Sequence, residues 1–207
     1  MNSKSKKDLE AITPKKALDI LLEGNKRFSR EVGFDYAVKD RINATQNAQY
    51  PFAVILTCMD SRVSTEIVFD QNIGDIFVIR VAGCVINEDI LGSIEYACGV
   101  VGSKLVLVLG HTKCGAVTGA CQDIDLGHLT GLLSKIKPAV NTVKNQGITQ
   151  EDEIVEAVNV ENVKNSIIDI ETRSSILKGL INKDELKIQG AVYDVSTGKV
   201  HLLHKNE

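Results

Sequence analysis

The 207-residue sequence predicts an α/β fold: a single domain with a central, mostly parallel β-sheet flanked by helices. Three observations predict it. Continuous apolar runs are typical of strands covered on both faces. These runs alternate with segments that have helical spacing. Two runs end in polar motifs, as expected where parallel strands form a binding crevice at their carboxyl ends. We expect an N-terminal helical arm at residues 1–50 and an α/β core at residues 51–207, one domain in all.

The N-terminal arm is expected to begin with one amphipathic helix. Thr13 is suited to the N-cap and Pro14 to the first helical position. Apolar residues then recur on one side until Gly24, which is expected to interrupt the helix. Residues 30–50 are polar and irregular, and predict an extended arm or a second short helix.

Three apolar runs predict the first strands of the sheet. They cover residues 52–57, 76–81 and 104–109. A helical stretch lies between the second and third runs, at residues 90–101, and Gly102 is suited to end it. Strand, helix and strand in this order indicate parallel pairing.

The C-terminal half predicts further helices and a closing strand pair. Small residues at 115–120 are suited to a closely packed helix, and residues 129–143 and 151–182 are both expected to be helical. Residues 188–195 and 199–203 flank a Ser-Thr-Gly turn. They predict a terminal hairpin that places the last strand at the sheet edge.

The composition excludes several classes of protein. A formal net charge of −3 gives no electrostatic basis for binding nucleic acid or a membrane surface. The longest apolar runs are about six residues, far short of a membrane span. No apolar segment of a signal peptide follows the charged first ten residues, so a cytoplasmic location is expected. Five cysteines are an odd number and favour thiols that bind metal in a reducing compartment.

Two short motifs supply a candidate metal site. They are Cys58-Met59-Asp60-Ser61-Arg62 and Gly110-His111-Thr112-Lys113-Cys114-Gly115, and each follows an apolar run. Two thiols, one carboxylate and one imidazole form a four-coordinate donor set suited to zinc. A carboxylate is unusual in structural zinc sites, so Asp60 indicates a site that can open to water. The second motif lacks the Lys-Ser/Thr pair of a phosphate-binding loop, because Ala116 and Val117 stand there.

Two roles are open for Arg62. It could form a surface salt bridge of little energetic consequence. Alternatively, it could hold the ionised Asp60 bidentately and keep that carboxylate off the metal. The remaining cysteines are expected to be structural: Cys84, Cys98 and Cys121.

With these motifs, the chain resembles a β-class carbonic anhydrase. The resemblance covers most of the sequence, and the two paired metal motifs make it specific. It is carried by residues 21–28, 58–62, 74–80, 93–97, 110–115 and 190–198.

The resemblance implies a zinc-dependent enzyme that reversibly hydrates CO2 to bicarbonate and a proton. One zinc ion (Zn2+) per chain would be held by Cys58, His111 and Cys114. Asp60 would be either the fourth ligand or the partner of Arg62. Zinc lowers the pKa of bound water from about 15.7 to roughly 7, which makes hydroxide available at neutral pH.

The resemblance also implies a substrate site at a subunit interface. The family forms homodimers and often homotetramers. Gln49 matches a glutamine that binds substrate from the neighbouring subunit, while Phe77 and Tyr96 match residues that line the CO2 pocket. No nucleic-acid or membrane partner is expected.

Several positions leave room for other functions. Val81 and Cys84 replace residues that are commonly polar in the family, and these departures bear on substrate identity. The alternatives are a hydrolase of CS2 or COS on the same scaffold, or a catalytically silent zinc- or bicarbonate-binding protein.

Some family members also have an inhibitory bicarbonate site that includes a tryptophan and an arginine. Here Ile55 stands in the place of the tryptophan, and Arg80 matches the arginine.

Overall fold

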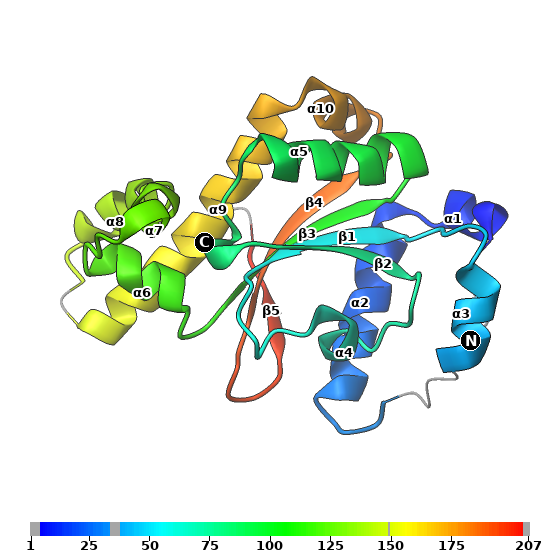
Figure 1. Cartoon of the computed structure of the whole chain (residues 1–207), viewed down its shortest axis with the longest axis horizontal. Helices are drawn as coiled ribbons and strands as arrows, with labels where there is room; N and C mark the ends of the chain where they lie inside the picture. Colours follow the sequence, from blue (N-terminus) through cyan, green and yellow to red (C-terminus); the bar gives the residue numbers. More distant parts are fainter. Residues whose placement is uncertain (1–4, 34–37, 149, 205–207) are drawn as a thin grey trace.

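The computed structural model describes residues 5–33, 38–148 and 150–204, and they form a layered α/β structure (Figure 1). A five-stranded sheet lies at its centre in the order β2-β1-β3-β4-β5. Neighbouring strands pair in parallel except β4 and β5, which are antiparallel. The strands are β1 (Ala53–Thr57), β2 (Ile76–Arg80), β3 (Leu105–His111), β4 (Lys187–Tyr193) and β5 (Val200–Leu202). The predicted fold class is therefore confirmed, including the C-terminal strand at the sheet edge.

Helices cover both faces of the sheet. In Figure 1, α5 and α10 lie above the sheet, α9 runs down its left side, and α2 and α4 lie below it. The helices before β3 are α1 (Lys6–Ala11), α2 (Pro14–Phe28), α3 (Val38–Thr45), α4 (Thr65–Val68), α5 (Glu88–Glu95), the short 3-10 helix η1 (Ala82–Cys84) and the π-helix η2 (Tyr96–Val101). Those after β3 are α6 (Gly115–Cys121), α7 (Gly127–Leu133), α8 (Lys137–Lys144), α9 (Glu151–Arg173) and α10 (Ser175–Asn182).

Strand β1 explains why the apolar runs are continuous. Its side chains alternate between the two faces, and both faces are buried. Val54 and Leu56 belong to the core that includes residues of α9, whereas Ala53 and Ile55 belong to the core that includes residues of α2. Each apolar residue of β1 therefore packs in one of the two cores.

The order of the strands places a change of direction between β1 and β3. From β1 the chain crosses to β2 on one side and then returns to β3 on the other side of β1. At such a switch of direction the connections leave on opposite sides, which opens the carboxyl ends of the two strands to a ligand. Both sequence motifs begin at this point.

The prediction that Gly24 interrupts the first helix is wrong. Helix α2 continues through Gly24 to Phe28. A Cβ atom at Gly24 would lie 1.8 Å from the carbonyl oxygen of Phe69. The glycine therefore lets the chain after α4 approach α2 closely, and that packing compensates for its low helix propensity.

Two long predicted helices are each divided. Residues 129–143 contain the end of α7 and most of α8, with a turn around Ser134. Residues 151–182 are split at Ser174, whose hydroxyl accepts a hydrogen bond from the Leu177 backbone N–H at 3.2 Å and caps α10. Helices α1 and α4 were not predicted, although Ser5 and Asp8 form a capping box at α1.

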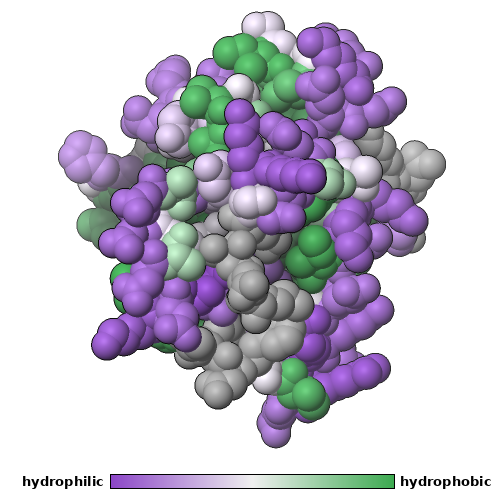
Figure 2. Space-filling model, turned by 90° about the vertical axis from the view of Figure 1, so that its right-hand side faces the viewer, coloured by the Kyte–Doolittle hydropathy of each residue, from purple (hydrophilic) through white to green (hydrophobic). Residues whose placement is uncertain are grey.

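The face that carries α1 and α3 is mainly polar. Outside the grey residues, Figure 2 shows hydrophobic side chains there as separate patches. Within residues 5–33, 38–148 and 150–204, no helix combines the length and hydropathy needed to cross a membrane.

Candidate metal centre

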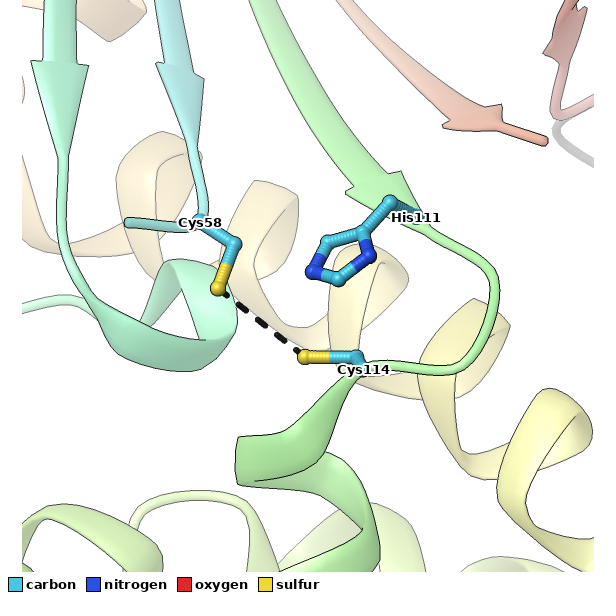
Figure 3. A group of neighbouring side chains, drawn as sticks. All are labelled: Cys58, His111 and Cys114. Carbon is cyan, nitrogen blue, oxygen red and sulfur yellow. Dashed lines mark hydrogen bonds between the residues drawn. The ribbon is translucent and has the colours of Figure 1, made fainter. Parts of the chain in front are cut away.

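Three side chains from the ends of β1 and β3 and the start of α6 point toward one another (Figure 3). Cys58 directly follows β1, His111 is the last residue of β3, and Cys114 is the N-cap of α6. Their ligand atoms lie within 4.8 Å of one another, and all three residues are buried. The switch between β1 and β3 thus brings together the residues that the two motifs predicted.

The three donors fit a zinc ion. Their sulfur atoms are 4.0 Å apart, close to the separation of about 3.8 Å that two 2.3 Å bonds at a tetrahedral zinc would give. Nδ1 of His111 lies 3.0 Å from the Thr112 carbonyl oxygen. Because a carbonyl can only accept, Nδ1 carries the hydrogen and Nε2 presents its lone pair. This Nε2 atom is buried and has no hydrogen-bond partner among the described residues.

The two thiols have opposite acidities. Hydrogen bonding with Cys114 lowers the pKa of Cys58 below that of an ordinary thiol, with smaller contributions from His111 and the Gly83 N–H. The same contact and burial raise the pKa of Cys114 far above that of an ordinary thiol. One thiolate is therefore stabilised before a cation binds, and binding a divalent ion would release the second proton.

The 3-10 helix η1 forms a wall behind Cys58. The Gly83 backbone N–H donates to the Cys58 sulfur at 3.4 Å. Gly83 has φ of 67°, and a Cβ atom there would lie 2.6 Å from the side chain of Ile136, so this position favours glycine. Asn162 donates to the Gly83 carbonyl at 2.7 Å, and Ser166 donates to the Cys84 carbonyl at 3.0 Å. Helix α9 thereby holds the loop that contacts the ligand.

The two departures from the family pattern lie in this same segment. The Val81 backbone N–H donates to the Thr57 carbonyl at 3.0 Å. The thiol of Cys84 is buried and donates to the Leu109 carbonyl at 3.3 Å. Burial raises the pKa of Cys84 well above its ordinary value. Both residues therefore contact the backbone beside the metal ligands.

Asp60 is paired with Arg62. Its Oδ1 accepts from Nε of Arg62 at 2.9 Å, and its Oδ2 accepts from Nη2 at 2.8 Å. The guanidinium holds the pKa of the Asp60 carboxyl well below its usual range. Oδ2 also lies 3.9 Å from Nε2 of His111. Of the two arrangements that the sequence left open, the structure contains the Arg62 pair, with the carboxylate beside the three ligands.

Arg80 braces the same loop from the edge strand β2. Its guanidinium donates to three successive carbonyl oxygens, those of Cys58 at 3.3 Å, Met59 at 3.1 Å and Asp60 at 2.6 Å. Sequence reasoning did not find this role, because the bonds join a side chain to a backbone about twenty residues away. The only signal was the position of Arg80 at the end of a strand next to β1.

Phe77 and Tyr96 lie together but apart from the metal ligands. Their rings meet edge to face with centroids 6.3 Å apart. Both line a cavity of 510 Å³ to which Cys58, His111 and Cys114 do not contribute. Phe77 is level with Val54 on β1, four residues before Cys58, which corresponds to about 13 Å along the strand. One subunit therefore does not bring this aromatic pair to its own metal centre.

Gln49 is exposed in the segment between α3 and β1. Within the part of the chain that the structure describes, no hydrogen bond joins its side chain to the metal ligands. The structure therefore does not place Gln49 in hydrogen-bond contact with the clustered side chains of its own subunit.

Comparisons with known proteins agree with this geometry. The family model described as carbonic anhydrase matches residues 53–200. Carbonic anhydrase 2 of Mycobacterium tuberculosis is 37% identical over 196 residues, which cover 91% of this chain and 92% of that protein. The carbonic anhydrase of Mycolicibacterium smegmatis is 34% identical and covers 91% of this chain and 93% of its own.

Solved structures show the same fold. The β-carbonic anhydrase CafA of Aspergillus fumigatus has a TM-score of 0.75 at 26% identity, covering 93% of this chain and 91% of its own. A Coccomyxa β-carbonic anhydrase has a TM-score of 0.72 at 26% identity, covering 90% and 86%. A tetrameric β-carbonic anhydrase of Sordaria macrospora has a TM-score of 0.72 at 25% identity, covering 76% and 83%. The matched residues 53–200 include both metal motifs.

Proposed function

Because the chain belongs to the carbonic anhydrase family and to its β class, we propose that it reversibly hydrates CO2 to bicarbonate and a proton at the Cys58–His111–Cys114 centre. One observation carries this proposal. A buried imidazole lone pair faces two thiols, and an ionised carboxylate lies 3.9 Å from that same nitrogen. This arrangement combines a metal-binding pocket with a fixed acceptor for a reacting group.

Cys58, His111 and Cys114 would hold one zinc ion per chain. Zinc bound there would supply Lewis acidity, which makes hydroxide available near neutral pH. The protein contributes the orientation of its ligands: the Thr112 carbonyl sets the tautomer of His111, and the Gly83 N–H supports the Cys58 thiolate. These supports keep the ligands in place without help from the substrate.

Asp60 and Arg62 would orient the reacting group. An ionised carboxylate can only accept hydrogen bonds, so Asp60 selects a neighbour that donates a hydrogen, such as hydroxide, and disfavours an oxygen without one. The Arg62 pair keeps Asp60 ionised and prevents it from turning toward the metal. A hydroxide held there would donate its hydrogen to Asp60 and would keep its lone pair free for CO2.

We further propose that Gln49, Phe77 and Tyr96 serve the centre of a second subunit. Tyr96 is 53% exposed although it is a large aromatic residue, and its partner Phe77 lies on β2 at the edge of the sheet. An edge strand with exposed apolar neighbours is suited to an interface. The tetrameric state of the similar Sordaria macrospora protein supports a homodimer or homotetramer.

We propose a cytoplasmic location because the cysteines are present as free thiols. All five cysteines are unpaired, and two of them belong to the metal centre. Thiols stay reduced in the cytosol, whereas an oxidising compartment favours disulfides. Fractionation of the native cells, with the protein detected by antibody, tests this location.

Stopped-flow measurement of CO2 hydration on the purified protein, with its zinc content, tests the proposed function. We expect activity that depends on zinc. Cys84 and Val81 lie beside the ligands, so the assays include two alternatives. These are hydrolysis of CS2 or COS, and binding of bicarbonate without turnover. Parallel assays with CO2, CS2 and COS separate them. Zinc-loaded protein that turns over CS2 or COS but not CO2 would overturn the assignment of substrate.

A further inference from the structure

The backbone of Lys113 is held from both sides. It lies between the ligands His111 and Cys114 and has φ of 55°, a left-handed conformation that is costly for a residue with a side chain. Its N–H donates to Oε1 of Glu156 at 2.8 Å. Its carbonyl accepts from Nη2 of Arg62 at 3.1 Å. The peptide backbone at Lys113 therefore links α9 to the arginine that grips Asp60.

Glu156 is attached to a firmly placed helix. Helix α9 packs directly on β3 at Gly110, where a Cβ atom would lie 2.7 Å from Val163 and 2.8 Å from Asn159. Asn162, on the same helix, donates to the Gly83 carbonyl. The position of α9 is thus fixed against β3 and against η1, and Glu156 transfers that position to the loop between His111 and Cys114.

We propose that Glu156 is a positioning residue for the Asp60–Arg62 pair. By accepting the Lys113 N–H, it keeps this residue left-handed and turns the Lys113 carbonyl toward Arg62. Arg62 then has its Nη2 group fixed by two acceptors, Lys113 and Asp60. Without Glu156 the strained loop relaxes, the carbonyl turns away, and Arg62 holds Asp60 less well. The consequence for catalysis rests on the proposed function.

The contact assigns Glu156 a role as a hydrogen-bond acceptor rather than as a proton carrier. Its partner is a backbone amide, which does not exchange a proton during turnover. The amide oxygen of glutamine accepts the same bond without a charge. A glutamine variant therefore separates the two roles.

Two variants of Glu156 and one control test the proposal. Glu156→Ala removes the acceptor, and Glu156→Gln keeps it. Glu153→Ala is the matched control, because Glu153 is an exposed acidic residue one turn earlier on α9. Loss of one bond to a carboxylate predicts that kcat/KM falls about tenfold in Glu156→Ala. We expect Glu156→Gln to recover most of that loss and Glu153→Ala to match the wild type.

Zinc transfer to a chelator gives a second readout that does not depend on activity. Because Lys113 adjoins Cys114, a relaxed loop releases zinc faster. We expect faster transfer from Glu156→Ala than from the wild type, Glu156→Gln or Glu153→Ala. An inactive wild-type protein would contradict the proposed function while leaving this comparison interpretable.

Lys113→Gly completes a double-mutant cycle. Glycine adopts the left-handed conformation without the cost that a side chain imposes. If Glu156 acts through that conformation, Glu156→Ala has a smaller effect in the Lys113→Gly background than in the wild type. Equal effects in both backgrounds, or a Glu156→Gln variant as impaired as Glu156→Ala, would overturn the proposal.

Discussion

Asp60 and Arg62 meet through two parallel side-chain hydrogen bonds, at 2.9 Å and 2.8 Å, and the Arg62 backbone N–H adds a third at 3.0 Å. The residues are only two positions apart, so the turn after β1 presents the carboxylate and its partner together. This pair lies beside the three metal ligands. Under the proposed function, this pair determines whether the carboxylate turns toward the metal or toward the reacting group.

Arg62→Ala is predicted to abolish most activity while the protein keeps its zinc. Without the guanidinium, Asp60 keeps only the backbone N–H of residue 62 among its bonds to that residue, so it can turn toward the metal and take the place of the reacting group. Loss of this orientation predicts a fall in kcat/KM of about 100-fold or more. Stopped-flow kinetics, zinc analysis and a structure at alkaline pH would measure it. An Arg62→Ala variant with the wild-type rate at every pH would reduce Arg62 to an ordinary surface partner.

The rate of CO2 hydration should rise from acid to alkaline pH because the supply of hydroxide grows. Ionisation of Asp60 should not contribute to this rise. The pKa of Asp60 is held below its usual value of about 3.9. Its pairing is therefore fully present at neutral pH and is lost only as the pH falls through that lowered value. Carbon-13 NMR of labelled aspartate should show no Asp60 titration between about pH 5 and 9. A signal that titrates in this range and disappears in Asp60→Asn would contradict the prediction.

Gln49→Ala is predicted to lower kcat/KM by about tenfold, as expected for one lost substrate hydrogen bond, with zinc content unchanged. Gln46→Ala is the matched control, since Gln46 is exposed in the same segment and donates only to the nearby Asn43 carbonyl among the bonds described. Analytical ultracentrifugation of both variants checks their assembly. A monomeric wild-type protein with full activity would rule out a role for Gln49 across an interface.

Bicarbonate should not inhibit this enzyme cooperatively. Ile55, which stands where some family members have a tryptophan, is fully buried, and the Arg80 guanidinium is occupied by three backbone carbonyls. Binding an anion there would require Arg80 to leave the loop that carries Cys58 and Asp60. Initial rates measured against bicarbonate concentration should fit simple competition. A sigmoidal response, with bicarbonate bound beside Arg80 in a crystal, would show that Arg80 does leave.

The sequence predicted that Cys58, His111 and Cys114 come together because the signals for their positions are local. Each of the two motifs lies at the end of an apolar run, and parallel strands bring those ends together. Gly24 was misread for the opposite reason. Its close contact with the Phe69 carbonyl joins segments 45 residues apart, and no local pattern records such packing. The break at Ser174 was also hidden, since helical spacing continues on both sides of it.

The residues that support the centre through backbone contacts could not be predicted from the sequence. Arg80, Glu156 and Asn162 all bind backbone atoms of distant loops. A backbone partner can be any residue type, so it leaves no motif at the other end of the bond. These contacts emerge only when the sheet and α9 are assembled around the two motifs.

The zinc content of the wild type, Cys114→Ser and Cys121→Ser, measured with their CO2 hydration rates, tests the central claim most directly. Cys121 is half-buried on the same helix, α6, and is not one of the three clustered donors, so it is the matched control. We predict about one zinc per chain and full activity in the wild type and Cys121→Ser, and loss of both in Cys114→Ser. A Cys114→Ser protein that keeps its zinc and its rate would contradict the assignment of this centre.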